Sequence, residues 1–265
     1  MKFEFSKYQA TGNDFILIDN RAGQYSFTKE QITRLCHRKF GIGADGLILI
    51  EKHPELDFNL IYYNSDGSQS LCGNGCRAGV NMAASLGMVK GKARFNAYDG
   101  AHEAEVYPDD IVKLKMNDVA EVKALGEDMF LDTGSPHYIK FINAIEDYPV
   151  YEEGRKVRFG ESFKPGGTNA NFVEILAENA IFVRTYERGV ENETLSCGTG
   201  VVAAALASSL RGHSSPVKIG TLGGQLTVQF KKGSQNSTPA GQPGGFSDIF
   251  LIGPAKLVYQ GSMEL

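Results

Sequence analysis

Two cysteines stand at the head of two similar short motifs. Cys72 begins Cys-Gly-Asn-Gly and Cys197 begins Cys-Gly-Thr-Gly, and a run of small and apolar residues follows each motif. A cysteine just before a helix meets unpaired backbone N–H groups and the positive end of the helix dipole, which together favour its thiolate. Two such sulfurs can supply a base on one face of a carbon and an acid on the other. We therefore predict that Cys72 and Cys197 form a thiolate/thiol pair that inverts a carbon centre without any cofactor.

The predicted helix starts also form an anion site. The glycines after each cysteine let a ligand approach the main chain closely, and helix N-termini hydrogen-bond carboxylates well. Such bonds stabilise the charge that develops when the carbon beside a carboxylate loses its proton. The pattern thus predicts an amino-acid racemase or epimerase that acts on a small molecule.

Other chemistries remain open at these residues. Cys72 and Cys76, with Cys36 and His37, suggest zinc, but a structural zinc site normally has two closely spaced ligand pairs and the second pair is missing. We therefore predict no metal. Any single cysteine could instead have a purely structural role as a small buried hydrophobic residue, but the repetition of the motif argues against this interpretation.

Two further functional classes compete with a racemase. A cysteine hydrolase would use Cys72 or Cys197 as nucleophile and His137 as base, which leaves the second motif unexplained. His137 follows Ser135 and Pro136, so a structural role in a turn is as well supported by the sequence as a role in the active site. A non-enzymatic amino-acid-binding protein would use the same anion sites without needing the thiols.

The two halves of the chain repeat the same series of sequence landmarks, which indicates an internal duplication. The cysteine motifs lie 125 residues apart, and Thr11-Gly12-Asn13 precedes the first by 61 residues whereas Thr133-Gly134-Ser135 precedes the second by 64. Turn-forming residues before each cysteine, 64–67 and 187–189, continue the same order of landmarks. Similar landmarks at similar spacing predict two lobes with one plan.

The hydrophobic pattern predicts an α+β fold. Short segments rich in aromatic and branched residues indicate strands, and the alanine-rich runs 75–86 and 200–210, nearly free of charge, indicate one buried helix per half. The predicted strands cover 3–8, 15–19, 47–51, 58–63, 111–116, 172–176, 181–186, 225–230 and 249–252. We expect each lobe to be a mixed, curled sheet wrapped around its central helix.

Composition narrows the class of partner. The 265 residues include 27 basic and 31 acidic side chains, for a formal charge of −4, and they show no basic stripe of the kind that binds nucleic acid. The longest apolar run, 201–210, is half of what a membrane span needs, and the N-terminus does not resemble a signal peptide. We expect a cytoplasmic protein with no nucleic-acid or membrane partner. Segment 231–247, rich in Gly, Ser, Pro and Gln, is predicted as a flexible surface loop without a catalytic role.

At these motifs the sequence resembles the diaminopimelate epimerases, a family of cofactor-independent racemases related to proline racemase. The resemblance covers nearly the whole chain. It is carried by Gly12-Asn13-Asp14-Phe15, Gly41-Ile42-Gly43-Ala44-Asp45-Gly46, the stretches 64–77 and 187–200, and Gly253-Pro254-Ala255. The cysteine motifs are shared with proline or hydroxyproline racemases, which remain the alternative; the Gly-Asn-Asp-Phe and Glu-Arg-Gly motifs favour the epimerase.

The resemblance implies a reaction and a set of site residues. LL-2,6-diaminopimelate would be interconverted with its meso form on the route to lysine and peptidoglycan, without pyridoxal phosphate. Cys72 and Cys197 match the catalytic cysteines, the first described in that family as proton donor and the second as acceptor. The matched substrate-binding residues are Asn13, Asn64, Gly73, Asn74, Asn169, Glu187, Arg188, Gly198 and Thr199, with His137 in a supporting position.

The resemblance also implies a domain organisation. Residues 1–118, completed by a C-terminal strand within 253–265, would form the first lobe and 119–252 the second, with the active site between them. Homodimers are common in that family. One departure is Ser135, which stands where the family usually has asparagine and puts a hydroxyl in place of an expected amide.

Overall fold

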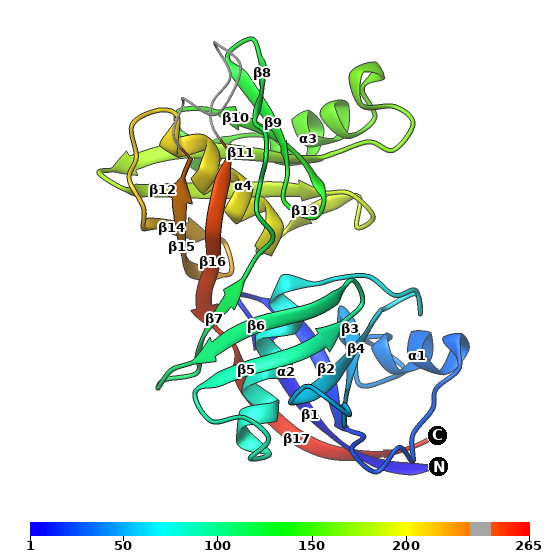
Figure 1. The fold of residues 1–265 in the computed structure, drawn as a ribbon. Helices are drawn as coiled ribbons and strands as arrows, with labels where there is room; N and C mark the ends of the chain where they lie inside the picture. Colours follow the sequence, from blue (N-terminus) through cyan, green and yellow to red (C-terminus); the bar gives the residue numbers. More distant parts are fainter. Residues whose placement is uncertain (234–244) are drawn as a thin grey trace. The chain divides into compact units, whose positions relative to one another are not determined.

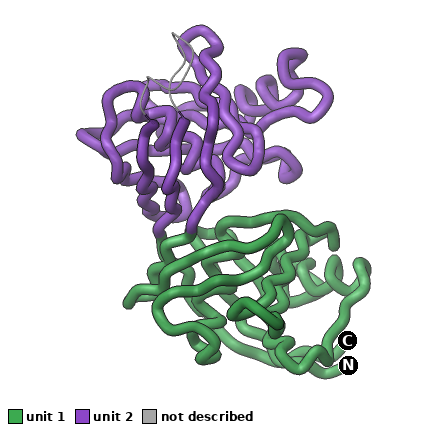
Figure 2. Tube along the Cα trace, in the orientation of Figure 1, with its two compact units in different colours: residues 1–114, 253–265 green, residues 115–252 purple. Residues whose placement is uncertain are grey.

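The computed structural model describes residues 1–233 and 245–265 as two compact units (Figure 2). Unit 1 comprises Met1–Leu114 with Gly253–Leu265, and unit 2 comprises Lys115–Ile252. Both combine mixed sheets with helices, which confirms the predicted α+β class. No helix in the described ranges is long and apolar enough to cross a membrane.

Unit 1 contains two helices among its strands (Figure 1). Its elements are β1 (Lys2–Ala10), β2 (Asn13–Asp19), α1 (Lys29–Cys36), β3 (Gly46–Glu51), β4 (Phe58–Asn64), α2 (Gly73–Ser85), β5 (Lys92–Ala97), β6 (Gly100–Val106), β7 (Ile111–Lys115) and β17 (Lys256–Glu264). The last residue of β7 already belongs to unit 2.

Unit 2 has a corresponding set of elements. They are β8 (Lys123–Leu125), β9 (Asp128–Asp132), β10 (Pro136–Phe141), η1 (Ile145–Asp147), α3 (Val150–Arg158), η2 (Glu161–Phe163), β11 (Asn169–Ala177), β12 (Ala180–Glu187), β13 (Asn192–Thr194), α4 (Gly198–Ser209), β14 (Val217–Thr221), β15 (Gly224–Lys232) and β16 (Phe246–Pro254). The final residues of β16 belong to unit 1.

The strands of the two units pair in the same order. In unit 1, β1–β2 is antiparallel, β2–β3 parallel, β3–β4 antiparallel, β4–β5 parallel, and β5–β6 antiparallel. In unit 2, β9–β10, β10–β11, β11–β12, β12–β14 and β14–β15 repeat that series. A parallel pair requires a crossover, and the four crossovers contain α1, α2, α3 and α4. The pairing order therefore gives structural support to a duplicated plan.

The C-terminal strand returns to the beginning of the chain. β17 pairs antiparallel with β1 along nearly its whole length, from Lys2 opposite Glu264 to Gln9 opposite Lys256. The corresponding place in unit 2 is taken by β8, which pairs with β9 and comes just before it in the sequence. Unit 1 is thus completed by residues from the far end of the chain.

The central helices α2 and α4 are buried, and most of their residues are small or apolar. Ten of the residues of α2 and eleven of those of α4 are buried, and the strands of each unit pack around its central helix. Small residues permit close packing: a Cβ at Gly79 would lie 2.4 Å from Leu60 Cδ1. This confirms the two buried helices, which begin two residues earlier than the alanine-rich runs suggested.

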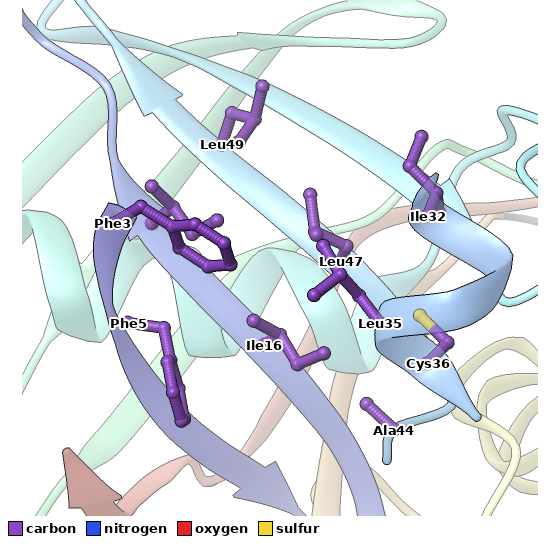
Figure 3. Close-up of a cluster of buried hydrophobic side chains, with 10 residues drawn as sticks. Phe3, Phe5, Ile16, Ile32, Leu35, Cys36, Ala44, Leu47 and Leu49 are labelled. Carbon is purple, nitrogen blue, oxygen red and sulfur yellow. The ribbon is translucent and has the colours of Figure 1, made fainter. Parts of the chain in front are cut away.

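The outer helix α1 covers the other face of the unit 1 strands. Thr28 caps it, and Gln31 completes a reciprocal capping box. Ile32, Leu35 and Cys36 on its inner face join a core cluster with residues of β1, β2 and β3 (Figure 3). The strands therefore carry apolar residues on both faces, one toward α1 and one toward α2.

Eight of the nine predicted strands lie within observed strands, and the ninth, 111–116, runs one residue past the end of β7. The strands β5, β6, β8, β9, β10, β13 and β14 were not predicted, and neither were the helices α1 and α3. Both are short and amphipathic, with eight and nine residues, and much of each is charged. Their periodic pattern spans too few turns to stand out from a polar connection. Of the predicted loop 231–247, the two ends extend β15 and β16, and the remainder, 234–244, lies outside the described residues.

Candidate active site

The first half-site is built at the start of α2. Cys72 is the N-cap residue in an extended conformation (φ −132°, ψ 109°), and its sulfur accepts a hydrogen bond from the backbone N–H of Gly75 at 3.4 Å. The sulfur thereby satisfies one of the amides that a helix start leaves unpaired. Gly73 and Asn74 form the first turn, so the structure places three predicted site residues side by side.

Asn13 is brought to Cys72 by the β1–β2 hairpin. Thr11 (φ 48°) and Gly12 (φ 86°) form a two-residue turn with positive φ angles, the geometry that matches the twist of paired strands. Asn13 begins β2 directly after this turn. Its Oδ1 lies 3.6 Å from Cys72 Sγ and 3.3 Å from Asn74 Nδ2. Residues far apart in the sequence thus meet around the first sulfur.

A charged network fixes the orientation of Asn13. Its Nδ2 donates to Asp45 Oδ2 at 2.6 Å, and a carboxylate can only accept, so Oδ1 must face Cys72. Arg38 bridges Asp45 and Asp14 at 2.7 Å to each, and Lys7 pairs with Asp14 at 2.6 Å. Two cations and two carboxylates therefore hold one amide.

Asp14 is the half-buried centre of this network. Burial by itself would raise the pKa of Asp14, but hydrogen bonds and positive charge from Arg38 and Lys7 outweigh it and hold that pKa below its usual value. Lys7 is buried and also donates to the backbone oxygen of Gly43. The network is consequently charged and internally neutralised at neutral pH.

Asn64 lies in a different environment. Its Nδ2 donates to the hydroxyls of Ser68 at 3.0 Å and Ser70 at 3.1 Å. These bonds hold the turn that leads from β4 toward α2. The side chain thus has a structural function in this turn, and a role in binding substrate stays a prediction.

The second half-site begins at α4. Cys197 is its N-cap residue (φ −111°, ψ 112°), and Gly198 and Thr199 form the first turn. Cys197 Sγ lies 3.6 Å from the hydroxyl of Thr199. Glycine is required at position 200, because a Cβ there would lie 2.4 Å from Asn171 Oδ1.

His137 lies at the centre of a neutral hydrogen-bond network. Its Nε2 is 2.9 Å from Ser135 Oγ and 3.0 Å from Thr199 Oγ1, and its Nδ1 is 3.0 Å from Asn171 Nδ2. The hydroxyl of Thr185 donates to Asn171 Oδ1 at 2.9 Å, which turns the Asn171 amide nitrogen toward the histidine. His137 Nδ1 is therefore an acceptor, and Nε2 carries the proton.

This arrangement keeps His137 uncharged. The residue is fully buried, and burial lowers its pKa to about 3, despite the bond from Asn171. A histidine base for a cysteine nucleophile needs a vacant ring nitrogen near the sulfur. Here Nδ1 accepts from Asn171 and Nε2 is protonated, so the geometry argues against the hydrolase alternative.

Ser135 is part of the second half-site although it departs from the family pattern. Its hydroxyl is 3.1 Å from Thr199 Oγ1 and 3.4 Å from Asn169 Nδ2, in addition to its contact with His137. The hydroxyl therefore links three predicted site residues.

Asn169 connects this network to the turn after β12. Its Oδ1 accepts from the backbone N–H of Arg188 at 2.8 Å, and its Nδ2 donates to the backbone oxygen of Pro136 at 3.0 Å. The Arg188 side chain is exposed, and its Nη1 donates to Gly166 O at 3.3 Å. Glu187 accepts from the hydroxyl of Thr194 at 3.0 Å. The guanidinium is thus held at the surface by a backbone oxygen.

The other two cysteines lie in packed interiors. Cys36 belongs to the core cluster beneath α1, and burial raises its pKa to about 12. Cys76 lies within α2, and burial raises its pKa still further. Both remain protonated at neutral pH, unlike a thiol that must titrate during catalysis.

Several residues that support the site were not predicted. Lys7, Arg38 and Asp45 reach Asn13 only through the β1–β2–β3 arrangement, and Asn171 with Thr185 reaches His137 only through the pairing of β10, β11 and β12. One available signal was the position of Asp45 in the Gly41–Gly46 motif. The alternation of Asn169 and Asn171 on one face of a strand was a second.

Comparison with known proteins identifies the family. A family model described as diaminopimelate epimerase matches residues 5–122 and 129–243. A diaminopimelate epimerase of Flavobacterium psychrophilum is 45% identical over 260 residues, which cover 96% of this chain and 97% of the relative. One from Aquifex aeolicus is 40% identical over 284 residues and covers 98% of each chain.

Solved structures share the fold at low sequence identity. A Bacillus anthracis protein of the PhzF phenazine biosynthesis family superposes with a TM-score of 0.75 at 14% identity over 100% of both chains. A hydroxyproline epimerase from Agrobacterium vitis gives 0.70 at 15% identity, covering 100% of this chain and 93% of the other. Fold likeness at this identity is shared by several chemistries, whereas the sequence relatives agree on one. The chain belongs to the diaminopimelate epimerase family.

Proposed function

We propose that this protein interconverts LL- and meso-2,6-diaminopimelate by moving protons between the substrate and two thiols. The observation that carries the proposal is that each unit places a cysteine at the N-cap of a buried helix, Cys72 before α2 and Cys197 before α4, in a chain of this family. The product would serve the synthesis of lysine and peptidoglycan.

The proposed step uses the two sulfurs in opposite protonation states. One thiolate takes the α-proton, so that a C–H bond breaks and an S–H bond forms. The electron pair left behind spreads into the neighbouring carboxylate. The other thiol then delivers its proton to the opposite face and becomes the thiolate, which inverts the centre and balances charge.

Backbone amides at the helix starts would hold the reacting carboxylate. Gly73, Asn74, Gly198 and Thr199 each lie in the first turn of α2 or α4, where N–H groups have no partner inside the helix. These donors would meet the charge that accumulates on the carboxylate oxygens as the proton leaves. The mechanism requires both half-sites to meet one substrate, so we place the active site between lobe 1–118, with 253–265, and lobe 119–252.

Recognition of the distal amino-acid group would fall to side chains outside the helix starts. Arg188 suits the second carboxylate, because a guanidinium can donate two parallel hydrogen bonds to it. Glu187 suits the distal ammonium group. The remaining polar contacts would come from Asn13, Asn64 and Asn169. His137 would hold the Thr199 hydroxyl in place through its hydrogen bond.

The reaction needs no pyridoxal phosphate, metal or other cofactor in this proposal. We further propose that the enzyme works in the cytoplasm. The sequence has four cysteines and no pattern of a disulfide framework, and the reducing cytoplasm keeps such thiols free. A homodimer, common in the family, is the expected assembly.

Isotope exchange tests the function directly. The purified protein, dialysed against chelator and free of pyridoxal phosphate, is incubated with LL-diaminopimelate in deuterated water. We expect the meso isomer to appear with deuterium at the inverted α-carbon, measured by chiral chromatography and mass spectrometry. Exchange into proline that is faster than into diaminopimelate would contradict the assignment, and the Cys72→Ala protein is the matched control.

A further inference from the structure

Arg77 is a fully buried cation next to the first half-site. It lies on α2 five residues after Cys72 and is 0% exposed. Nε and both terminal guanidinium nitrogens have no hydrogen-bond partner among the described residues. Burial lowers the pKa of Arg77 to about 10, so the group is still charged at neutral pH. A buried charge of this kind is costly unless an opposite charge lies nearby.

The neighbourhood offers few groups that could carry that negative charge. Two ionisable groups lie close to Arg77 along the helix, Cys72 at its N-cap and Cys76 directly before Arg77, and burial raises the pKa of Cys76 so far that it stays a thiol. Asp99 acts on Cys76 but is itself paired with His102 at 2.6 Å. Cys72 is therefore the group whose ionisation Arg77 stabilises most directly.

Asn13 acts on the same sulfur in the opposite direction. Because Asp45 holds the amide nitrogen, the carbonyl oxygen of Asn13 faces Cys72 Sγ at 3.6 Å. An oxygen acceptor at that position favours a thiol that donates a proton and disfavours a thiolate. Lys7, Arg38 and Asp14 neutralise the charge around Asp45, so its influence on Cys72 passes mainly through the Asn13 amide.

We propose that Arg77 and Asp45 are opposing positioning residues for Cys72. Arg77 favours the thiolate, and Asp45, acting through Asn13, favours the thiol. This inference rests on the proposed thiol pair. A reversible inversion passes each sulfur through both states, and two opposed influences keep both states accessible near neutral pH.

Unit 2 handles its sulfur by different means. The position of α4 that corresponds to Arg77, at the offset of 125 residues, is Val202, and the sequence of α4 contains no charged residue. The hydroxyl of Thr199 lies 3.6 Å from Cys197 Sγ and contacts the neutral His137, and Arg188 is exposed to solvent, which screens its charge. Within the described residues, α4 thus has no counterpart of the buried cation of α2.

The test measures the titration of Cys72 without substrate. Full-length protein carrying Cys197→Ala, so that the titration is not coupled to the second thiol, is pulsed with iodoacetamide between pH 5 and 10. The alkylated fraction of Cys72 is quantified by mass spectrometry, with Cys36 and Cys76 as internal buried thiols. Arg77→Met, Asp45→Asn and the double variant are compared in this background.

We expect opposite shifts from the two variants. Arg77→Met should raise the pH midpoint of Cys72 alkylation by about one unit, which lowers the rate below the midpoint about tenfold. Asp45→Asn frees the Asn13 amide to turn its nitrogen toward the sulfur and should lower the midpoint by a similar amount. The double variant should return close to the parent value.

Three controls separate this role from a structural one. Replacing a buried charge by an apolar side chain of similar length is often tolerated, and melting temperatures will show that Arg77→Met is folded. Asp14→Asn removes a carboxylate from the same network without releasing Asn13, so it should leave the midpoint of Cys72 unchanged. Val202→Met, made in a Cys72→Ala background, should leave the midpoint of Cys197 unchanged.

Specific outcomes would overturn the inference. A folded Arg77→Met protein with an unchanged Cys72 midpoint would show that Arg77 does not act on the sulfur, even if the KM for substrate rises. If the pH midpoint of Cys72 alkylation falls equally in Asp14→Asn and Asp45→Asn, a general charge effect acts on the sulfur in place of the route through Asn13. Since alkylation uses no substrate, the titration of Cys72 can be interpreted even if the protein does not catalyse the proposed epimerisation.

Discussion

The two half-sites share a scaffold but differ in the polar groups that surround it. In unit 1, Asn13 is held by a charged network that includes Asp45, and a fully buried cation, Arg77, lies on the helix that Cys72 caps. In unit 2, Thr199 is held by buried neutral groups centred on His137. Strand pairing and the central helix are repeated almost element for element, yet the first network is built on ion pairs and the second on neutral side chains.

This difference separates what packing fixes from what chemistry needs. A buried helix enclosed by strands places a sulfur at a fixed point in each unit, and that requires only small and apolar residues in the right order. The polar networks then decide how each sulfur is hydrogen-bonded. In the proposed reaction the two sulfurs act on opposite faces of one carbon, so different networks would give the two proton transfers different surroundings.

The largest expected effect comes from removing either sulfur. Cys72→Ala and Cys197→Ala should each lower the epimerisation rate by at least about a thousandfold, because a two-base inversion lacks either its base or its acid. The rate is followed as conversion of LL- to meso-diaminopimelate. Full activity in either variant would mean that the two half-sites are not chemical partners.

Cys36 provides the matched control for these variants. It is a buried thiol of the same unit as Cys72, packed beneath α1 and protonated at neutral pH. Cys36→Ala should cost about 1 kcal/mol of stability through the lost packing and leave kcat nearly unchanged.

The next largest effect should fall on unit 2 through Arg188. Arg188→Met removes the proposed bidentate donor for the distal carboxylate, and kcat/KM for diaminopimelate should fall about a hundredfold, mostly through KM. Lys164→Met offers a comparison, since Lys164 is an exposed cation in a surface pair with Glu161 and should change kcat/KM less than twofold. Equal effects of both changes would argue against a specific carboxylate contact.

His137 distinguishes the neutral network from the charged one. His137→Phe removes both ring nitrogens, so that Asn171 and Thr199 each lose one buried hydrogen-bond partner, and should cost about 1–3 kcal/mol of stability. We expect kcat to fall roughly tenfold, because the Thr199 hydroxyl beside Cys197 loses its orientation. A variant with unchanged kcat would assign His137 a purely structural role.

The fold could be predicted because its determinants are local or periodic. The buried helices are readable from runs such as 200–210, and each predicted strand is a dense apolar segment. The short helices α1 and α3 could not be read in this way, because they have few turns and a mostly charged exterior. Their place is set by the need to cross over between parallel strands, which is a property of the whole unit.

The site was predictable to the depth that motifs allow. Cys72 and Cys197 follow from the repeated motif at the two helix starts, whereas Asn13, Asn74 and Thr199 were expected as site residues only through the family resemblance. Asp45 and Asn171 each act by holding the amide or ring of another residue, and that relation depends on strand register. Register emerges from the packing of whole strands, so a sequence pattern does not reveal which two side chains will meet.

The last predicted effect is a pH dependence of stability that comes from a neutral histidine in unit 2. His137 has a pKa of about 3 in the folded protein and an ordinary value near 6.5 when unfolded, so the unfolded state binds a proton that the folded state does not. Its contribution is fully present above pH 6.5 and is lost as the pH falls toward 3, by up to about 1.4 kcal/mol per pH unit. The free energy of unfolding is measured by urea titration at pH 7 and at pH 5 for the parent and for His137→Gln. The parent should lose more free energy of unfolding than the variant between the two pH values. Equal losses would mean that His137 takes up its proton in the folded state, and the contrast between a charged and a neutral half-site would fail at this residue.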